Sequence, residues 1–383
     1  MNKERKKFRV IDADGTVVES YYDAPVKEEE HDEMATLERL PWFERGKPLK
    51  NWILHETNFY DEVDKIWGNK WGAEGLGKLR EVLVSKPTEN EVRKEYGAEP
   101  QYYYSMAPSG ETANMSKLQD QYDYLYKVLK ENGVRVNYVE PPVPMIGAYG
   151  YIKNLVTLAG AGLVAKGGAI VHRMGLGSWQ RGREVIWSKA LTTLGVPIYL
   201  TIHSTGIGEP GAGRWLDGKR FVFNSSTVAN EEGLRQINFI LGNLGLELVT
   251  QYSPGWVNSL DGGKIGTTHT DMNLLMADIG LAVVAPYFFD YSFVRYLANH
   301  KVKMIDVPMD EYWDLTCNGI TLEAGKVIVN KGAPKTIAKL RREGVDVIEI
   351  DFTESTRFGI SGIHCSVCEL KRDQPSPTLE ENK

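Results

Sequence analysis

Cysteine is scarce in this sequence: its 383 residues include three, Cys317, Cys365 and Cys368. An odd count in a chain of this length argues against a framework of disulfides. Long apolar runs are also missing, since none approaches the ~20 residues that a membrane-spanning helix needs. The basic start, "MNKERKKFRVIDADG", has no apolar segment behind it and is not typical of a secretory signal. We therefore expect a cytoplasmic protein with no membrane partner.

Positive charge is in deficit. The 45 Lys and Arg residues are outnumbered by 51 Asp and Glu residues, which gives a formal net charge of −6 at pH 7. A protein that binds the phosphate backbone derives its affinity from clustered Lys and Arg. The composition therefore predicts no nucleic-acid partner and favours a protein that handles a small molecule.

A C-x-x-C pair, Cys365 and Cys368, lies within "SGIHCSVCEL". A structural zinc site needs four ligands, and neither Cys317 nor the scattered histidines supply a second pair at a matching spacing. A thioredoxin-like pair would lie early in a βαβ unit and open a helix, whereas "KRDQPSPTLEENK" follows here. We expect no metal and no cofactor. Each thiol taken singly is also typical of an inert, buried cysteine.

One pattern recurs five times: a strand or hairpin, a helix, a stop, and a short alternating strand. Gly133, Gly195, Gly245 and Gly344 follow four of the helices, at the position where a left-handed cap favours a residue without Cβ. The helix–strand segments are "KLQDQYDYLYKVLKENGVRVNYV", "REVIWSKALTTLGVPIYLT", "EEGLRQINFILGNLGLELVTQ", "YSFVRYLANHKVKMIDV" and "PKTIAKLRREGVDVIEI".

Details of the copies refine this pattern. In the first, Leu118, Tyr122, Leu125 and Leu129 fall on one face of the helix. In the fourth, we expect Asn299 to adopt the left-handed cap. In the fifth, Pro334 opens the helix, where a missing N–H is harmless.

Units of this kind cannot bury their apolar faces alone, so they close around a common axis. The predicted fold is α/β, an α/β-propeller of five ββαβ modules around a pseudo-fivefold axis, spanning residues 76–373. Residues 1–75 are rich in charge and tryptophan, and we expect them to form an N-terminal extension packed on the propeller. Residues 374–383 form a C-terminal tail. The extension or a propeller edge is a candidate surface for a homo-oligomer.

Five such modules that end in "SGIHCSVC" resemble the amidinotransferase and arginine deiminase superfamily, which shares the pentein fold and modifies guanidine-like groups. The resemblance covers roughly residues 75–370. "SGIHCSVC" is similar to the superfamily's nucleophile turn, which implies that Cys365 is the catalytic thiolate and Cys368 a bystander. The "EPGA" stretch and the tail look most like the branch of 2-nitroimidazole nitrohydrolase.

Two further motifs carry the resemblance. "TTHTDMN" is similar to the superfamily's His-x-Asp, which implies that His269 is the acid–base and Asp271 a carboxylate that binds substrate. "GIGEPGAGRWLDGKRFVF" lies where the superfamily has Glu-Gly-Gly-Asp, which implies that Glu209 lies beside the histidine. Taken singly, His269 is also typical of a loop histidine, and Asp271 of an N-cap for "MNLLMAD".

Attack on a guanidine-like carbon requires these residue types independently of the resemblance. A carbon flanked by nitrogens is a poor electrophile, so its attack favours a thiolate. A thiol with a pKa near ~8.5 needs a cation or a dipole beside it to ionise at neutral pH. A histidine then protonates the leaving nitrogen and activates water, and a carboxylate orients it or binds substrate N–H groups.

Two departures from the superfamily concern the substrate. Members that act on arginine carry Arg-Asp where "YIKNLVTLAG" has Lys153 and Asn154, and the last acid of Glu-Gly-Gly-Asp is replaced by Ala212. A charge-assisted hydrogen bond contributes about 1.5–3 kcal/mol, which an asparagine at position 154 forfeits. We therefore expect a substrate less cationic than arginine, such as an amidine-like or N-heteroaromatic molecule, with Asn154 among the residues that bind it.

The leading hypothesis is a cysteine-dependent hydrolase that cleaves a C–N bond at an N–C–N carbon through a covalent thiolate adduct. An amidinotransferase, which passes the amidino group to an amine, and a nitroimidazole-type nitrohydrolase are the alternatives. A non-catalytic pentein that binds a partner is a third class, disfavoured by the complete set of candidate residues. The sequence does not decide whether three arginines bind an anionic group or have a structural role: Arg173, Arg181 and Arg183.

Overall fold

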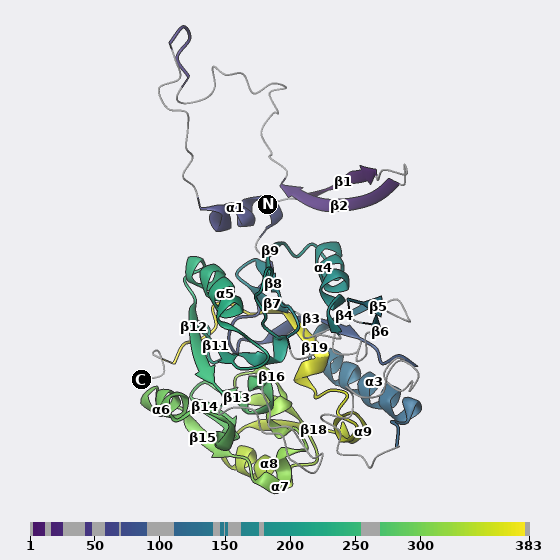
Figure 1. The fold of residues 1–383 in the computed structure, drawn as a ribbon, viewed down its shortest axis with the longest axis vertical. Coiled ribbons are helices and arrows are strands. Elements are labelled where there is room, and N and C mark those ends of the chain that lie inside the picture. The colour runs from purple at the N-terminus through teal and green to yellow at the C-terminus, as the bar shows by residue number, and fades with distance from the viewer. Residues whose placement is uncertain are drawn as a thin grey trace. The chain divides into compact units, whose positions relative to one another are not determined.

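In a computed structural model the chain divides into two units, residues 1–70 and 71–383, and Figure 1 labels their elements. The structure describes residues 3–11, 17–25, 43–47, 58–68, 70–89, 111–140, 146–148, 150–151, 162–175, 180–253 and 269–379. Within these ranges no helix is long and apolar enough to cross a membrane.

The described residues of the first unit form a hairpin and one helix. Strand β1 (Lys3–Ile11) pairs antiparallel with β2 (Val17–Pro25). Helix α1 (Phe59–Trp67) begins after Asn58, whose side chain accepts a hydrogen bond from the Tyr60 N–H. The first unit ends at residue 70, whereas the expected N-terminal extension ends at residue 75. The packing of this unit on the propeller remains a prediction.

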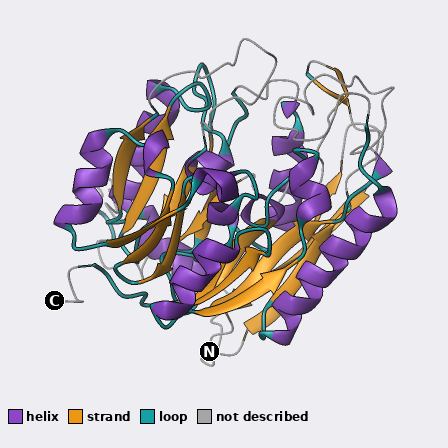
Figure 2. Cartoon of the chain, turned by 90° about the horizontal axis from the view of Figure 1, so that it is seen from below, coloured by secondary structure: helices purple, strands orange, loops and turns teal. Residues whose placement is uncertain are grey.

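The second unit repeats one module five times. In each module two antiparallel strands are followed by a helix and a third strand that pairs in parallel with the second. This arrangement confirms the five-module α/β fold, and Figure 2 shows the helices flanking the sheets. Four modules are continuous in sequence: β7 (Gly162–Ala165), β8 (Gly168–Val171), α4 (Arg183–Thr193), β9 (Ile198–Thr201); β10 (Gly213–Trp215), β11 (Arg220–Ser225), α5 (Glu231–Asn243), β12 (Glu247–Tyr252); β13 (Leu274–Asp278), β14 (Leu281–Val284), α6 (Tyr291–Asn299), β15 (Lys303–Asp306); and β16 (Ile320–Glu323), β17 (Lys326–Asn330), α8 (Pro334–Arg342), β18 (Asp346–Ile350).

The remaining module joins the two ends of the propeller. Strand β3 (Leu79–Ser85) pairs in parallel with β4 (Arg135–Val139) across helix α3 (Met115–Glu131), and antiparallel with β19 (Val367–Arg372). The first module therefore takes the strand equivalent to the first strand of the other modules from a segment almost 300 residues later. Arg372 secures the joint by donating hydrogen bonds to the carbonyls of Gly77 and Thr321.

Short elements connect the modules, and several carry the residues of the site. They are β5 (Ile146–Gly147), β6 (Gly150–Tyr151), α7 (Met309–Tyr312), α9 (Thr353–Arg357) and five 3₁₀ turns: η6 (Pro210–Ala212), η7 (Thr270–Met272), η8 (Pro286–Phe288), η9 (Thr316–Asn318) and η10 (His364–Ser366).

Helix ends follow the predicted pattern with one correction. Gly133, Gly195, Gly245 and Gly344 have φ between 69° and 85°, and Pro334 is the first residue of α8. In the fourth copy Asn299 is the last residue of α6, and Lys301 has φ 58° instead. The Lys301 N–H bonds the Ala298 carbonyl, and Val302 bonds Leu297, as Gly133 and Val134 do after α3. The predicted cap was wrong by two residues because Lys301 holds the place of the glycine.

Apolar helix faces pack against the sheets. Leu118, Tyr122, Leu125 and Leu129 of α3 are all fully buried, as their spacing predicted. They join a cluster with residues of β3 and the segment after β18, including Phe352, whose ring packs at a 48° tilt against Tyr122 with centroids 4.8 Å apart. Burial of such side chains stabilises by about 1.5–3 kcal/mol each. The helices thereby hold the inner strand ends and 3₁₀ turns that line the site.

Candidate active site

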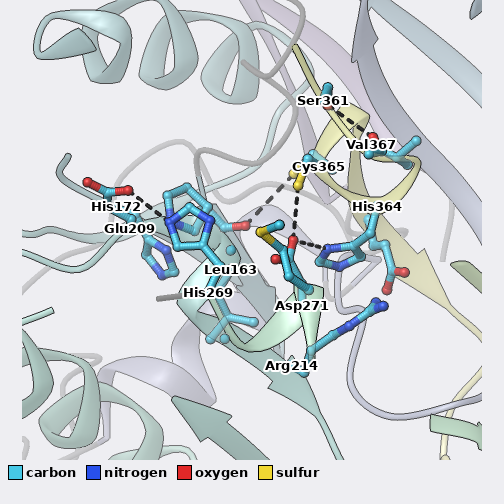
Figure 3. A pocket seen from close by; sticks show the side chains of 18 of the residues that line it. Leu163, His172, Glu209, Arg214, His269, Asp271, Ser361, His364, Cys365 and Val367 are labelled. Atoms are coloured by element: carbon cyan, nitrogen blue, oxygen red, sulfur yellow. Dashed lines mark hydrogen bonds and ion pairs between the residues drawn. The ribbon is translucent and has the colours of Figure 1, made fainter. Parts of the chain in front are cut away.

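The 3₁₀ turns and inner strands surround a cavity of about 210 Å³. It is lined by four residues singled out in the sequence: Glu209, His269, Asp271 and Cys365. They come from three segments: Glu209 precedes η6, His269 and Asp271 lie just before and within η7, and Cys365 lies in η10. Figure 3 shows Glu209 beside His269 and Cys365 beside Asp271. The fifth predicted residue, Asn154, lies outside the described residues.

Cys365 lies in η10, on the turn that leads into β19. Its N–H donates to the Asn318 side-chain oxygen at 3.2 Å, and its Sγ lies 3.2 Å from both Asn318 Nδ2 and Asp271 Oδ2. Asn318 packs so closely against the turn that a Cβ on Gly362 would be 2.1 Å from its Oδ1. The glycine of "GIHC" is therefore required for close packing, and Asn318 fixes the sulfur from a neighbouring module.

Asp271 lies in η7 and gathers two donors on one oxygen. Its Oδ2 accepts from His364 Nδ1 at 2.9 Å and from the Cys365 thiol at 3.2 Å (Figure 3). Oδ1 has no hydrogen-bond partner within the described part of the chain and lines the same cavity. The turn is anchored by the Thr270 hydroxyl, which donates to the Ala212 carbonyl at 2.8 Å. The N-cap alternative is wrong, because the residues that follow form strand β13 rather than a helix.

Burial and charge act on the thiol and the carboxylate in opposite ways. Burial, together with the adjacent Asp271 charge, raises the pKa of Cys365 well above its usual value. Burial also favours the neutral form of Asp271, but the hydrogen bond from His364 and nearby positive charge outweigh it and lower the pKa of Asp271. The unliganded site therefore holds a neutral thiol that donates to an ionised carboxylate.

His269 and Glu209 form a second pair across the cavity. Glu209 Oε2 lies 2.9 Å from His269 Nε2, and Oε1 accepts the Gly175 N–H at 2.8 Å. Burial lowers the pKa of His269, but the Glu209 hydrogen bond and charge more than offset this, so its pKa is raised. The pair therefore keeps His269 protonated to higher pH than an isolated imidazole.

Gly211 keeps the space between these groups open. A Cβ at this position would lie 2.7 Å from His269 Nδ1 and 3.0 Å from Asp271 Oδ1. With Nε2 bonded to Glu209, Nδ1 is the nitrogen that remains for proton transfer to a substrate. Gly211 holds the place of the second glycine in the Glu-Gly-Gly-Asp pattern. Without a Cβ it leaves room for a reacting group between His269 and Asp271.

Sequence reasoning missed three contributors: His364, Asn318 and Arg214. His364 was visible beside Cys365 but had no assigned role. Arg214 is buried and donates to the carbonyls of Leu274 at 3.1 Å, Cys317 at 3.0 Å and Gly319 at 2.8 Å. Burial lowers the pKa of Arg214, and the charge of Asp271 acts in the opposite sense. No local pattern could have shown that these residues converge, since their partners lie 47 to 105 residues away.

The other cysteines are buried, and none of the three forms a disulfide. Burial raises the pKa of Cys317 to about 12 and that of Cys368 further, so both are poor nucleophiles. Cys368 packs in a core cluster beside Leu83 and Leu370. No group of three or more His, Cys, Asp or Glu side chains in the described ranges is arranged to hold a metal ion.

The structure distinguishes the three arginines for which the sequence allowed either anion binding or a structural role. Arg173 donates to the carbonyls of Ser204 and Gly206, and Arg181 to that of Met174. Only Arg183 among the three lines the cavity, where it is buried and bonded to the Gln180 side chain.

Comparison with known proteins gives one family model and one relative that is similar over most of the chain. Residues 283–372 match a family model described as Arginine deiminase. The chain is 27% identical over 365 residues to the 2-nitroimidazole nitrohydrolase of Mycobacterium sp. (strain JS330), which covers 90% of this chain and 94% of that protein.

Solved structures share the fold. The N-terminal domain of ArgZ, an arginine dihydrolase from cyanobacteria, superposes with a TM-score of 0.61 at 17% identity over 76% of this chain and 97% of its own. DDAH from Pseudomonas aeruginosa gives a TM-score of 0.58 at 19% identity, over 76% and 99% of the two chains. At these identities the likeness concerns the fold alone.

Proposed function

We propose that this chain, which has the fold of ArgZ and DDAH and is similar to arginine deiminases over residues 283–372, is a hydrolase of non-peptide C–N bonds. Its substrate is a small molecule with an electron-poor carbon between two nitrogens. The observation that carries this proposal is one cavity holding the Cys365–Asp271 contact and the His269–Glu209 pair. These supply a nucleophile, a binding carboxylate and an acid–base, which this reaction class requires.

The reaction proceeds in two halves. Substrate N–H groups bind Asp271, so the thiol of Cys365 loses its hydrogen bond there and releases its proton to water. Glu209 keeps His269 as an imidazolium, whose charge favours the thiolate. The thiolate forms a bond to the N–C–N carbon, and the C–N bond to the leaving group breaks as His269 protonates that group. Water then adds to the adduct, giving one proton to His269, and the C–S bond breaks to release the thiolate, which takes a proton back from water. Overall the leaving group is exchanged for a hydroxyl from water.

A weakly cationic or neutral substrate fits this site best. Ala212, where arginine-directed members carry an acid, is fully buried and supplies no charge. Asn154 remains part of this proposal as a neutral substrate ligand. Likeness over 90% of the chain to a 2-nitroimidazole nitrohydrolase favours a nitroimidazole-type reaction as a specific candidate, in which nitrite leaves without needing a proton. The attacked carbon is again flanked by two nitrogens.

An amidinotransferase uses the same covalent half-reaction and differs in what resolves the adduct. The two activities are separated by turnover in the presence of glycine or lysine. A hydrolase releases the hydroxylated or carbonyl product at an unchanged rate, whereas a transferase forms a new amidino compound in proportion to the amine.

Intact-protein mass spectrometry tests the proposal. The wild-type protein is incubated with an amidine, a guanidine and 2-nitroimidazole, and we expect a mass increase that maps to Cys365. Cys365→Ser should remove the adduct and turnover, while Cys368→Ser serves as the matched thiol control and keeps both. Absence of any adduct and of any turnover across the whole panel would refute the proposed function.

A further inference from the structure

His172 is a second polar feature of the cavity, separate from the predicted residues. It follows strand β8 directly, is 3% exposed, and lines the cavity with its ring. Backbone hydrogen bonds between Arg173 and Gly208 run in both directions, so this antiparallel bridge places His172 opposite Glu209. The ring packs edge-on against Phe223, with centroids 5.5 Å apart. Figure 3 shows it beside the His269–Glu209 pair.

Neither ring nitrogen of His172 has a hydrogen-bond partner in the described part of the chain. The other described histidines each have one, as with His203 and His300, which bond backbone carbonyls. A buried polar atom without a partner destabilises the folded state, and native proteins contain few of them. An unpaired imidazole on a cavity wall therefore marks a position where a ligand supplies the missing hydrogen bond.

The ring is neutral at physiological pH, because burial lowers the pKa of His172 to about 3 and no neighbouring carboxylate offsets it. A neutral imidazole has one N–H donor and one bare nitrogen that accepts. The burial that disfavours an imidazolium equally disfavours a cationic substrate group placed against the ring. This wall therefore differs from the Asp271 side of the cavity, which carries a negative charge.

We propose that His172 is a specificity-determining residue that hydrogen-bonds the substrate through a ring nitrogen and selects uncharged N–C–N compounds over cationic ones. The inference rests on the proposed function, because it names the substrate class for the same cavity. Asp271 and His172 then form two opposed contacts: a carboxylate for substrate N–H groups, and a neutral ring for an uncharged polar atom such as an azole nitrogen or a nitro oxygen.

Binding to the Cys365→Ala protein tests this without turnover. The probes are 2-nitroimidazole at mildly acidic pH, where it is neutral and keeps the N–H that Asp271 binds, and methylguanidine, a cation at the same pH. Adding His172→Phe, which keeps a ring but removes both nitrogens, should raise the Kd of the nitroimidazole at least tenfold. The Kd of methylguanidine should change less than twofold. His172→Gln, which keeps a donor and an acceptor, should recover most of the nitroimidazole affinity.

A second measurement does not depend on the His172→Phe protein being folded. In Cys365→Ala with ¹⁵N-labelled histidine, saturation with the nitroimidazole should shift one ring-nitrogen signal of His172, assigned by its absence in His172→Gln. Unshifted His172 signals at saturation, equal weakening of both probes by His172→Phe, or failure of the nitroimidazole to bind would each overturn the inference. Adduct formation at Cys365 in the wild-type protein is measured in parallel, so failure of this inference is distinguished from failure of the proposed function.

Discussion

Two histidine–carboxylate pairs face the cavity, with the same separation and opposite shifts of the histidine pKa. His269–Glu209 and His364–Asp271 both have N···O distances of 2.9 Å. Yet the pKa of His269 is raised, whereas that of His364 is lowered. Burial lowers both values, and Arg214 lowers that of His364 further, so the carboxylate prevails in the first pair only. Hydrogen-bond distance alone therefore does not tell which imidazole is an acid.

The difference assigns separate roles. His269 carries a proton that it can transfer, while neutral His364 donates its Nδ1–H to Asp271 and helps keep that carboxylate ionised. Arg214 contributes to this division through charge, although its hydrogen bonds are all to backbone carbonyls. In the reaction proposed above, the first pair transfers protons and the second prepares a binding site for substrate N–H groups.

The largest effect is expected from Glu209→Gln. Burial then acts on His269 without the opposing charge, so the pKa of His269 falls. In the wild-type protein His269 stays protonated until the pH rises through its raised pKa. Removing the Glu209 charge lowers this pKa, so the alkaline limb of kcat/KM moves to lower pH. We expect turnover near neutral pH to fall by about 10²–10⁴-fold, the range of general acid–base catalysis. A pH–rate profile with an unmoved alkaline limb would contradict the role of the pair.

Gly211→Ala should give the next largest loss, on the order of 10²-fold in kcat/KM, because an added Cβ occupies the gap between His269 Nδ1 and Asp271 Oδ1. Gly242→Ala in α5 is the matched control, since its Cβ would meet nothing within 4 Å. That control should keep full activity and gain up to ~1 kcal/mol of stability from helix propensity. Steady-state kinetics and thermal unfolding check both variants, and equal activity in the two would show that the gap is not used.

His364→Phe should reduce activity about tenfold and act on the opposite limb. Without the His364 hydrogen bond, burial raises the pKa of Asp271. The ionised carboxylate is lost as pH falls through its pKa, so the acidic limb of kcat/KM moves to higher pH. The same pH–rate measurement that follows Glu209→Gln serves here. If both variants moved the same limb, the two pairs would not have separate roles.

The smallest effect is expected from Cys368→Ser, within about twofold in kcat. Its thiol is buried in a core cluster and has a strongly raised pKa, so it contributes packing rather than chemistry. Burying a hydroxyl there should cost about 1–3 kcal/mol of stability, measured by denaturant unfolding. Loss of activity at a temperature where the variant remains folded would place Cys368 in the reaction.

Much of the fold could be predicted because its modules are local. Each helix, its cap and the following strand lie within about 25 residues, so their periodicity is visible in the sequence. The joint between β3 and β19 was not visible, because it pairs segments nearly 300 residues apart. Lys301 shows a second limit: its left-handed backbone follows from its place after α6, although a glycine is the usual residue there.

Some residues of the candidate site could be indicated by the sequence, and others could not. The motifs around Cys365, His269 and Glu209 are compact, so resemblance could indicate them. Arg214 and Asn318 act through atoms contributed by other modules, and the unpaired nitrogens of His172 are a property of its surroundings. Such features depend on contacts between modules in the closed ring rather than on residues that are adjacent in the sequence.

The joint at β19 also sets an order of events during synthesis. Cys365 precedes the strand that completes the first module, so a ribosome must translate nearly the whole propeller before this sulfur can meet Asp271 and Asn318. A growing chain therefore carries the Cys365 thiol apart from Asp271 and Asn318 until its last module has been made. The surroundings that the structure gives this sulfur are a late product of synthesis.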